Sequence, residues 1–231
     1  MAAIARVMFG IDRIGGAPAD ENLGHAAGPE LLPNVTGVIL AGGQSRRMGS
    51  NKAVLPYGGV PLIERIYRQM SELFVETVVV TNTPELYPFL PCPKVKDQYP
   101  GMGPLAGIHA ALNYSRTRYI AVVACDMPWI STRLIRELAG FRDGSDVILP
   151  EGDHGLEPLH AIYSKECIPF IEESLNADRR RIVSFFDRVK VQVMTLDQTS
   201  QIEPSLRAFR NINTVQEYQQ SLENQVIGST R

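Results

Sequence analysis

The sequence lacks the features that mark several large classes of protein. Its 23 basic and 25 acidic side chains nearly cancel to a formal net charge of −2, so bulk attraction to nucleic acid or to an anionic membrane is not expected. No apolar run approaches the roughly 18 residues that a membrane-spanning helix needs. We therefore predict a cytoplasmic protein with neither a nucleic acid nor a membrane as partner.

Cysteine is scarce, and histidine shows no useful spacing. Cys92, Cys125 and Cys167 are odd in number, lie far apart and form no C-x-x-C pair, which excludes a disulfide framework and a zinc site. The four histidines are scattered without the spacing of metal ligands. Trp129, the only tryptophan, follows an Asp-Met-Pro turn and is interpreted as a packing residue.

The chain is long enough for one sizeable core. With 231 residues and 44% apolar content, a single α/β domain is the natural organisation. Residues 1–34 are rich in Gly, Ala and Pro and contain few large apolar side chains. Because such a segment buries little, we predict a flexible N-terminal extension at 1–34 and one domain at 35–231.

Apolar strands alternate with amphipathic segments along the domain. Strands are expected at 38–40, 76–82, just before 97, at 117–128, 145–150, 157–163 and 189–194. Helices are expected at 61–74, from 104, from a cap at 131 or 132 to 138, at 168–175 and 178–186, and after a capping box at 214–217. This alternation predicts a Rossmann-like, doubly wound, mainly parallel sheet with helices on both faces.

A glycine-rich loop with basic residues follows the first apolar run. Val38–Leu40 gives way to Ala41-Gly42-Gly43, and Arg46, Arg47 and Lys52 follow. Glycines let backbone N–H groups approach an anion, and cationic side chains complete a phosphate cradle. The spacing is neither a P-loop nor a dinucleotide fingerprint. An ordinary turn after a buried strand is the alternative, but three basic residues on one loop favour the phosphate site.

Three polar residues stand at other predicted strand ends, namely Asn82, Asp97 and Asp126. Ligands of open α/β sheets bind outside the carboxyl ends of the strands, so these residues are candidates for one site. Asp126 suits Mg²⁺, which uses one or two carboxylates and completes its shell with substrate phosphates and water. Its alternative role is to cap the helix that follows Pro128.

The residues of this loop carry a family resemblance. LAGGQSRRMGSNK, from Leu40 to Lys52, followed by LPYGGVPLIE, resembles the nucleotide signature of MobA-like nucleotidyltransferases, and more narrowly of molybdenum cofactor guanylyltransferases. Every fixed position of L-A-G-G-x-S-x-R-M-G-x-x-K is present, and the resemblance extends over residues 36–218. Some family members carry an acidic residue just before the lysine, where this chain has Asn51.

The resemblance implies a reaction and a set of partners. It implies Mg²⁺-dependent transfer of GMP from GTP to a molybdopterin-type cofactor with release of pyrophosphate, and it makes molybdoenzyme delivery proteins possible partners. The rivals are a cytidylyltransferase for the same cofactor, a sugar-phosphate nucleotidyltransferase and a non-catalytic nucleotide-binding or cofactor-delivery module. Leu40-Ala41-Gly42-Gly43 and Asn211-x-Asn213 favour guanylyl transfer, and Lys52 together with Asp126 argues against a silent module.

The resemblance also assigns roles to single residues. Arg47, Lys52 and Asp126 become the catalytic group, with Asp126 as metal ligand, while Asn82 and Asp97 match nucleotide-binding positions. Asp97 can accept from the guanine edge or from a ribose hydroxyl, and both readings stay open. The full nucleotide-binding set is Leu40, Ala41, Gly42, Gly43, Lys52, Asn82, Asp97 and Asp126, and the acceptor-binding set is Arg180, Arg181, Asn211 and Asn213.

Each acceptor-binding assignment has a simpler alternative. Three consecutive arginines are often a solvated helix face. Asn-x-Asn before a capped helix can be turn chemistry alone.

Overall fold

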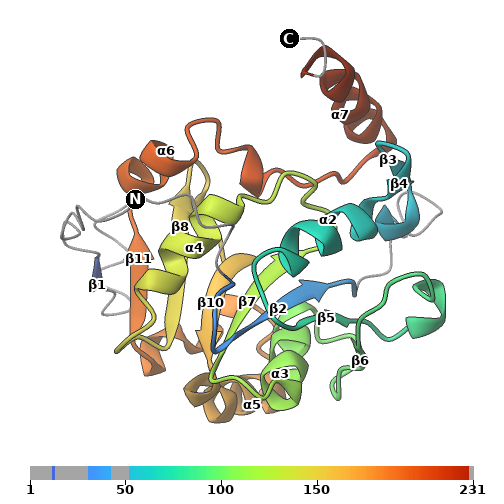
Figure 1. The fold of residues 1–231 in the computed structure, drawn as a ribbon. Coiled ribbons are helices and arrows are strands. Elements are labelled where there is room, and N and C mark those ends of the chain that lie inside the picture. Colours follow the sequence, from blue (N-terminus) through green and yellow to red (C-terminus); the bar gives the residue numbers. More distant parts are fainter. Residues whose placement is uncertain (1–11, 14–30, 43–51, 229–231) are drawn as a thin grey trace.

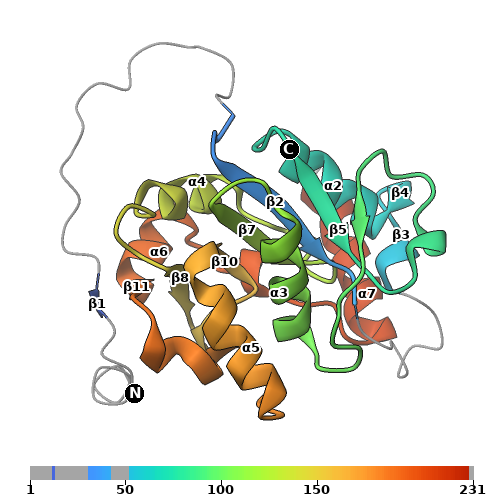
Figure 2. The same cartoon turned by 90° about the horizontal axis from the view of Figure 1, so that it is seen from below.

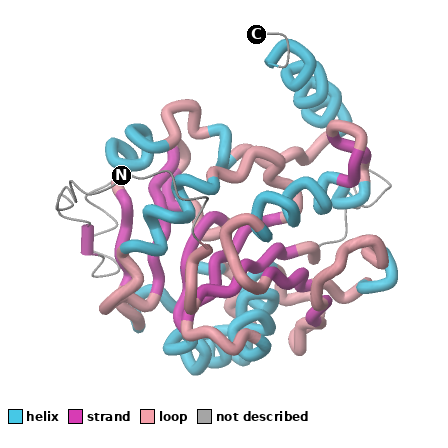
Figure 3. Tube along the Cα trace, viewed as in Figure 1, coloured by secondary structure: helices cyan, strands magenta, loops and turns pink. Residues whose placement is uncertain are grey.

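A nine-stranded sheet runs through the centre of the protein (Figures 1 and 3). The structure, a computed structural model, describes residues 12–13, 31–42 and 52–228. The strand order is β1-β11-β8-β10-β7-β2-β5-β6, with β9 paired to β8, and a separate hairpin joins β3 and β4. The strands are β1 (Asp12–Arg13), β2 (Val35–Leu40), β3 (Pro56–Tyr57), β4 (Val60–Pro61), β5 (Thr77–Val80), β6 (Lys94–Val95), β7 (Tyr119–Ala124), β8 (Val147–Gly152), β9 (Gly155–Leu156), β10 (His160–Ser164) and β11 (Val191–Met194).

Helices cover both faces of this sheet. In Figures 1 and 2, α2 and α4 lie against one face and α3 and α5 against the other. The α-helices are α2 (Leu62–Ser71), α3 (Pro104–Tyr114), α4 (Thr132–Gly140), α5 (Ile168–Asn176), α6 (Leu196–Ile202) and α7 (Val215–Gly228). The 3₁₀ helices are η1 (Lys52–Val54), η2 (Pro84–Leu86), η3 (Lys165–Cys167), η4 (Ile182–Arg188) and η5 (Arg207–Phe209). None of the helices in the described ranges is long and apolar enough to cross a membrane.

The alternation of side chains along the central strands produces two cores. On β2, Ile39 belongs to the core shared with α2 and α4, whereas Val38 and Leu40 belong to the core shared with α3 and α5. All three side chains are buried, as expected for a strand covered on both faces. The predicted doubly wound, mainly parallel architecture is therefore confirmed, with β10 antiparallel to both β7 and β8.

Two predicted helices differ from the structure. The segment expected as a helix at 178–186 forms the 3₁₀ helix η4, which starts at Ile182 because Arg181 is still extended. Its buried Ile182 and Phe185 are three residues apart, the spacing that a 3₁₀ helix aligns on one side. The helix expected at 61–74 is α2, which begins after Pro61 because that residue has the extended backbone of strand β4.

Part of the predicted extension contacts the domain. Asp12 and Arg13 pair in parallel with Gln192 and Val193 of β11. Leu32 donates its backbone N–H to Leu73 O at 2.7 Å. The extension's other residues before Leu31 lie outside the described residues, and the boundary at residue 35 stays a prediction.

Gly37 in β2 is needed for close packing. An added Cβ would lie 2.6 Å from Phe74 Cδ2 and 2.8 Å from Thr77 Oγ1. We expect Gly37→Ala to lower the free energy of unfolding by about 1–3 kcal/mol, because inserted atoms force a packed core apart. Urea denaturation would measure it. Gly140→Ala is the control, because a Cβ there meets nothing within 4 Å, and a fall as large for Gly140→Ala would contradict the packing argument.

Candidate functional site

The carboxyl ends of four neighbouring strands form one edge of the sheet. Ala41 N donates to Val80 O at 2.9 Å, Cys125 N to Leu40 O at 3.0 Å, and Thr81 N to Val95 O at 2.8 Å. The segments after β2, β5, β6 and β7 therefore leave the sheet side by side. Leu40 and Ala41 are buried and Gly42 is exposed, whereas the proposed Gly43 and Arg47 lie outside the described residues.

Lys52, Asp126 and Asn213 come together at this edge. Lys52 Nζ donates to Asn213 Oδ1 at 3.1 Å across 161 positions of sequence. The backbone N–H of Ile212, one residue earlier, donates to Asp126 O at 2.9 Å. The positive charge of Lys52 is close enough to act on the pKa of Asp126. The predicted loop lysine, strand-end carboxylate and Asn-x-Asn motif thus form one group.

Asp126 is a partly buried carboxylate with a nearby cation. Burial raises the pKa of its carboxyl above the usual value, while Lys52 and a backbone N–H act in the opposite direction. The alternative role as a helix cap is not observed, because Ser131 Oγ caps α4 by accepting from Leu134 N at 3.3 Å. Within the described part of the chain, the cap of α4 therefore does not require the Asp126 carboxylate.

The small number of carboxylates at the site limits which metal ion it could bind. Among the described residues, no group of three His, Cys, Asp or Glu side chains gathers as a metal site. Asp126 alone fits the pattern of Mg²⁺, which often takes few protein ligands and several oxygens from phosphate and water. It does not fit a structural zinc site, which needs four protein ligands.

Asn82 and Asp97 form a second group at the same edge. Asn82 Nδ2 donates to Asp97 Oδ2 at 2.7 Å, and Asp97 N donates to Asn82 Oδ1 at 3.1 Å. The other carboxylate oxygen, Asp97 Oδ1, is buried and has no hydrogen-bond partner in the described part of the chain. A ligand donor would satisfy this orphaned acceptor, because a buried unpaired oxygen is costly.

The Asn-x-Asn motif is anchored by the cap of α7. Asn213 N and Thr214 N donate to Glu217 Oε2 at 2.6 and 2.9 Å, and Glu217 N donates to Thr214 Oγ1 at 3.1 Å. The pKa of Glu217 is lowered, chiefly because its carboxylate accepts a hydrogen bond from the backbone N–H of Asn213. The predicted capping box is confirmed, and because Asn213 also accepts from Lys52, its role extends beyond turn chemistry.

Arg180 and Arg181 lie apart from this group in their contacts. Both are exposed in the segment between α5 and η4. Arg180 pairs with Asp178 at 2.9 Å, and no hydrogen bond or ion pair among the described residues links either arginine to Lys52, Asp126 or Asn213. Their contacts in the structure are those of solvent-exposed surface residues, and acceptor binding stays a prediction.

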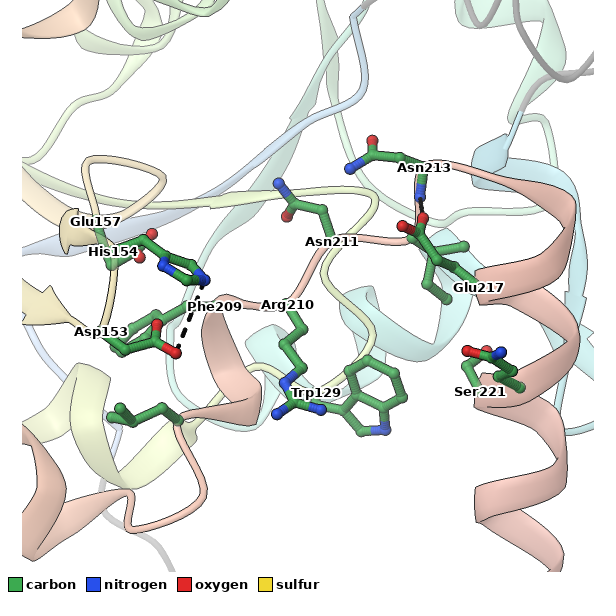
Figure 4. Close-up of a pocket in the computed structure, with 13 residues that line it drawn as sticks. Trp129, Asp153, His154, Glu157, Phe209, Arg210, Asn211, Asn213, Glu217 and Ser221 are labelled. Atoms are coloured by element: carbon green, nitrogen blue, oxygen red, sulfur yellow. Dashed lines mark hydrogen bonds and ion pairs between the residues drawn. The ribbon is translucent and has the colours of Figure 1, made fainter.

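A cavity of about 510 Å³ adjoins the Asn-x-Asn motif (Figure 4). Figure 4 shows Asp153, His154 and Glu157 on one side and Asn213, Glu217 and Ser221 on the other. Trp129 also lines the cavity, and its ring packs edge-on against Tyr57 at 6.4 Å, which agrees with its predicted packing role. The lining residues are Trp129, Asp153, His154, Glu157, Leu206, Phe209, Arg210, Asn211, Ile212, Asn213, Glu217, Gln220 and Ser221.

Glu157 is a cavity residue that the sequence did not single out as a candidate. Burial, and secondarily the neighbouring charge of Asp153, raises the pKa of its carboxyl to about 7. A signal was present in the sequence, since Glu157 follows the polar Gly-Asp-His-Gly turn and precedes the strand-like segment that became β10. That signal was weak because nothing in the sequence places this turn opposite Asn211 and Asn213.

Comparison with known proteins gives a consistent family. A model of the MobA-like NTP transferase domain matches residues 37–192. A probable molybdenum cofactor guanylyltransferase of Carboxydothermus hydrogenoformans is 36% identical over 83% of this chain and 96% of its own length. One from Pelotomaculum thermopropionicum is 41% identical over 78% of this chain and 87% of its own length.

A solved structure agrees with these relatives. The molybdopterin-guanine dinucleotide biosynthesis protein A of Archaeoglobus fulgidus superposes with a TM-score of 0.74 at 27% identity, covering 83% of this chain and 99% of its own. The match of the family model covers Leu40, Lys52 and Asp126, the residues on which the resemblance was first based. The chain is a nucleotidyltransferase and belongs to the MobA-like NTP transferase family.

Proposed function

We propose that this enzyme transfers GMP from GTP to the terminal phosphate of a molybdopterin-type cofactor and releases pyrophosphate. The observation that carries the proposal is the group formed by Lys52, Asp126 and Asn213 beside a cavity of about 510 Å³. The group supplies a charged site for phosphates, and the cavity offers room for a second substrate. The names of the relatives from Carboxydothermus and Pelotomaculum support the choice of substrates.

The chemistry requires little from the protein beyond position and charge. An oxygen of the acceptor phosphate attacks the α-phosphorus of GTP, and the bond between that phosphorus and the bridging oxygen to the β-phosphate breaks. The attacking oxygen is already anionic at neutral pH, so no general base is needed. The electron pair of the broken bond leaves with pyrophosphate, and a nearby cation such as Lys52 favours that departure.

The residues divide these tasks. Lys52 places a point charge on the phosphates, and Asn213 orients its amine through the 3.1 Å hydrogen bond. Backbone N–H groups of Gly42 and Gly43 and the guanidinium of Arg47 would complete the phosphate cradle, since the N–H of Ala41 is already bonded to Val80 O. Asp126 would hold Mg²⁺, which when bound neutralises phosphate charge and orients the phosphate oxygens.

Base selection is assigned to hydrogen bonds near Leu40-Ala41-Gly42 and to the Asn82–Asp97 group. The phosphate cradle is blind to the base, so Lys52 and Asp126 cannot choose between nucleotides. Asp97 Oδ1, buried without a partner, can accept either from the guanine edge or from a ribose hydroxyl. Arg180 and Arg181 stay proposed acceptor contacts, and delivery of the product to molybdoenzymes stays a predicted partnership.

Turnover with competing nucleotides tests the proposal. We expect GTP to be preferred over CTP and ATP by roughly ten- to a hundred-fold for each base contact, since a lost buried partner costs about 1–3 kcal/mol. Equal GTP and CTP would be offered with molybdopterin, and both dinucleotide products would be quantified. A CTP preference would move the assignment to cytidylyl transfer. Turnover with a sugar phosphate but not with molybdopterin would show that the acceptor is a sugar phosphate.

A further inference from the structure

We propose that Glu157 determines acceptor specificity by accepting hydrogen bonds from the aminopyrimidinone edge of the acceptor's pterin ring. This inference rests on the function proposed above and assigns its acceptor site in more detail. Glu157 lines the cavity beside the Asn-x-Asn motif, on the wall opposite Asn213 and Glu217 (Figure 4). The acceptor would then span the site, with its phosphate at Lys52 and its ring at Glu157.

The backbone on both sides of the carboxylate is fixed. Glu157 N donates to Pro150 O at 3.0 Å, and His160 N donates to Glu157 O at 3.1 Å. The side chain lies against Gly152, where an added Cβ would be 2.8 Å from Glu157 Oε1 and 2.9 Å from Phe209 Cδ2. Because Gly152 has no side chain, the Glu157 carboxylate and the Phe209 ring can occupy this part of the cavity wall.

The carboxylate of Glu157 lacks a hydrogen-bond donor within the described ranges of the chain. No hydrogen bond or ion pair to the Glu157 side chain occurs among the described residues, and the charge that acts on it most is the like charge of Asp153. A half-buried carboxylate beside another carboxylate is unfavourable, and such groups concentrate at functional sites. A ligand that brings hydrogen-bond donors would remove this cost.

The charges of the cavity select the kind of ligand group. Asp153, Glu157 and Glu217 contribute three carboxylates, whereas Arg210 contributes the one guanidinium in the described lining. This balance repels a phosphate and attracts a group rich in donors. The pyrimidinone edge of a pterin presents a ring N–H beside an amino group, and these two donors match the two oxygens of one carboxylate.

Aromatic side chains suit the same ligand. Trp129 and the largely buried Phe209 line the cavity together with Glu157. Arg207 covers one face of Trp129, so a ring system would pack against the aromatic surface that faces the cavity.

The phosphate end of the acceptor has a separate cation at Lys52, which is bonded to the lining residue Asn213. The wall at Asp153 and Glu157 is therefore acidic. On the opposite wall the Glu217 carboxylate already accepts from Asn213 N and Thr214 N, and Lys52 lies nearby, so one direction of binding is favoured.

Glu157→Gln tests the inference, because glutamine keeps the shape and replaces one acceptor oxygen by a donor. We expect the KM for molybdopterin to rise at least tenfold, with a smaller change in kcat and a KM for GTP within twofold of wild type. Glu151→Gln is the matched control from the neighbouring strand β8, where Glu151 pairs with Leu156, the residue before Glu157. Glu151 lies outside the cavity lining and accepts from Leu196 N at 3.4 Å.

Thermal unfolding separates a binding role from a structural one. Burial raises the pKa of Glu157, so its charged form is disfavoured in the folded protein, and Glu157→Gln is expected to keep or raise the unfolding midpoint at pH 8. An unchanged molybdopterin KM in Glu157→Gln would overturn the inference. A lower midpoint accompanied by equal rises in both KM values would also overturn it.

Binding of neopterin gives a readout that does not depend on nucleotidyl transfer. Quenching of neopterin fluorescence should show binding to wild type and to Glu151→Gln, and at least tenfold weaker binding to Glu157→Gln. Equal affinities, or no binding to wild type, would overturn the inference even if GMP transfer is observed. Conversely, discrimination between the variants without GMP transfer would support the pterin site while contradicting the proposed reaction.

The pH dependence of neopterin binding gives the same test a second arm. Because the charged carboxylate is the acceptor, wild-type affinity should rise as pH increases from 6 to 8, through the Glu157 pKa of about 7. The charged and titratable groups of the lining that share the cavity with it are Asp153, His154, Arg210 and Glu217. All four are kept in Glu157→Gln, so an equal pH slope in the variant would contradict the assignment to Glu157.

Discussion

Replacing Asp126 with asparagine is expected to remove most nucleotidyl transfer and leave the fold intact. Asparagine keeps the shape of the side chain but loses the charge that would hold Mg²⁺. Lewis-acid stabilisation of phosphate oxygens contributes several kcal/mol, so a fall of about a hundred- to a thousand-fold in kcat is the expected order. Turnover of GTP with molybdopterin at saturating Mg²⁺ would measure it.

Stability is expected to respond differently from activity. Burial raises the pKa of Asp126, so the charged form is less favourable in the folded protein than in the unfolded chain, and neutral asparagine should not lower stability near pH 8. Asp143→Asn is the control, since Asp143 is exposed in the turn between α4 and β8. Near wild-type turnover of Asp126→Asn in saturating Mg²⁺ would refute the metal assignment.

The sheet and its binding edge could be predicted because their signals are local. An apolar run such as 119–124 has to be buried, and the polar residue that ends it, Asp126, then stands at the carboxyl edge. Asn82 and Asp97 follow apolar runs in the same way, and their two side chains are hydrogen-bonded to each other. A capping box at Thr214 and Glu217 is equally local and is observed.

The other features of the site depend on long-range contacts that sequence spacing does not encode. Lys52 and Asn213 are separated by 161 positions, and their hydrogen bond follows from the return of the chain after α6 to the sheet edge. Periodicity also cannot give strand direction, so the antiparallel β10 was not foreseen. Glu157 at the cavity depends on both, because it follows the β8–β9 hairpin and faces the returning segment (Figure 4).

Arg180 and Arg181 show that a family resemblance does not predict which residues contact each other. Arg180 and Arg181 were grouped with the acceptor residues by resemblance, yet Arg180 pairs with Asp178 two residues away. The pair is solvent-exposed, and such an ion pair contributes little to stability. An acceptor phosphate would have to compete with this aspartate for Arg180, whereas it would meet Lys52 held by a neutral amide.

Replacing Lys52 with alanine is expected to weaken both GTP binding and turnover. The charge serves the bound triphosphate and the transition state alike, so KM for GTP should rise while kcat falls. Charge-assisted hydrogen bonds contribute roughly 1.5–3 kcal/mol, which predicts a loss of about ten- to a hundred-fold or more in kcat/KM. Calorimetry with GTP and steady-state turnover would measure the two parts. Lys190→Ala, an exposed lysine just before β11, is the control.

Asn213 makes the Lys52 prediction sharper. If Asn213 orients the lysine through their 3.1 Å bond, Asn213→Ala should lower kcat/KM in the presence of Lys52 and have a much smaller effect in Lys52→Ala. A double-mutant cycle gives this coupling directly, and directly contacting residues typically couple by about 0.5–3 kcal/mol. Additive effects would mean that Asn213 acts on the acceptor independently of Lys52. Unchanged GTP affinity and turnover in Lys52→Ala would exclude the lysine from the phosphate site, because its position beside Asp126 would then have no bearing on the reaction.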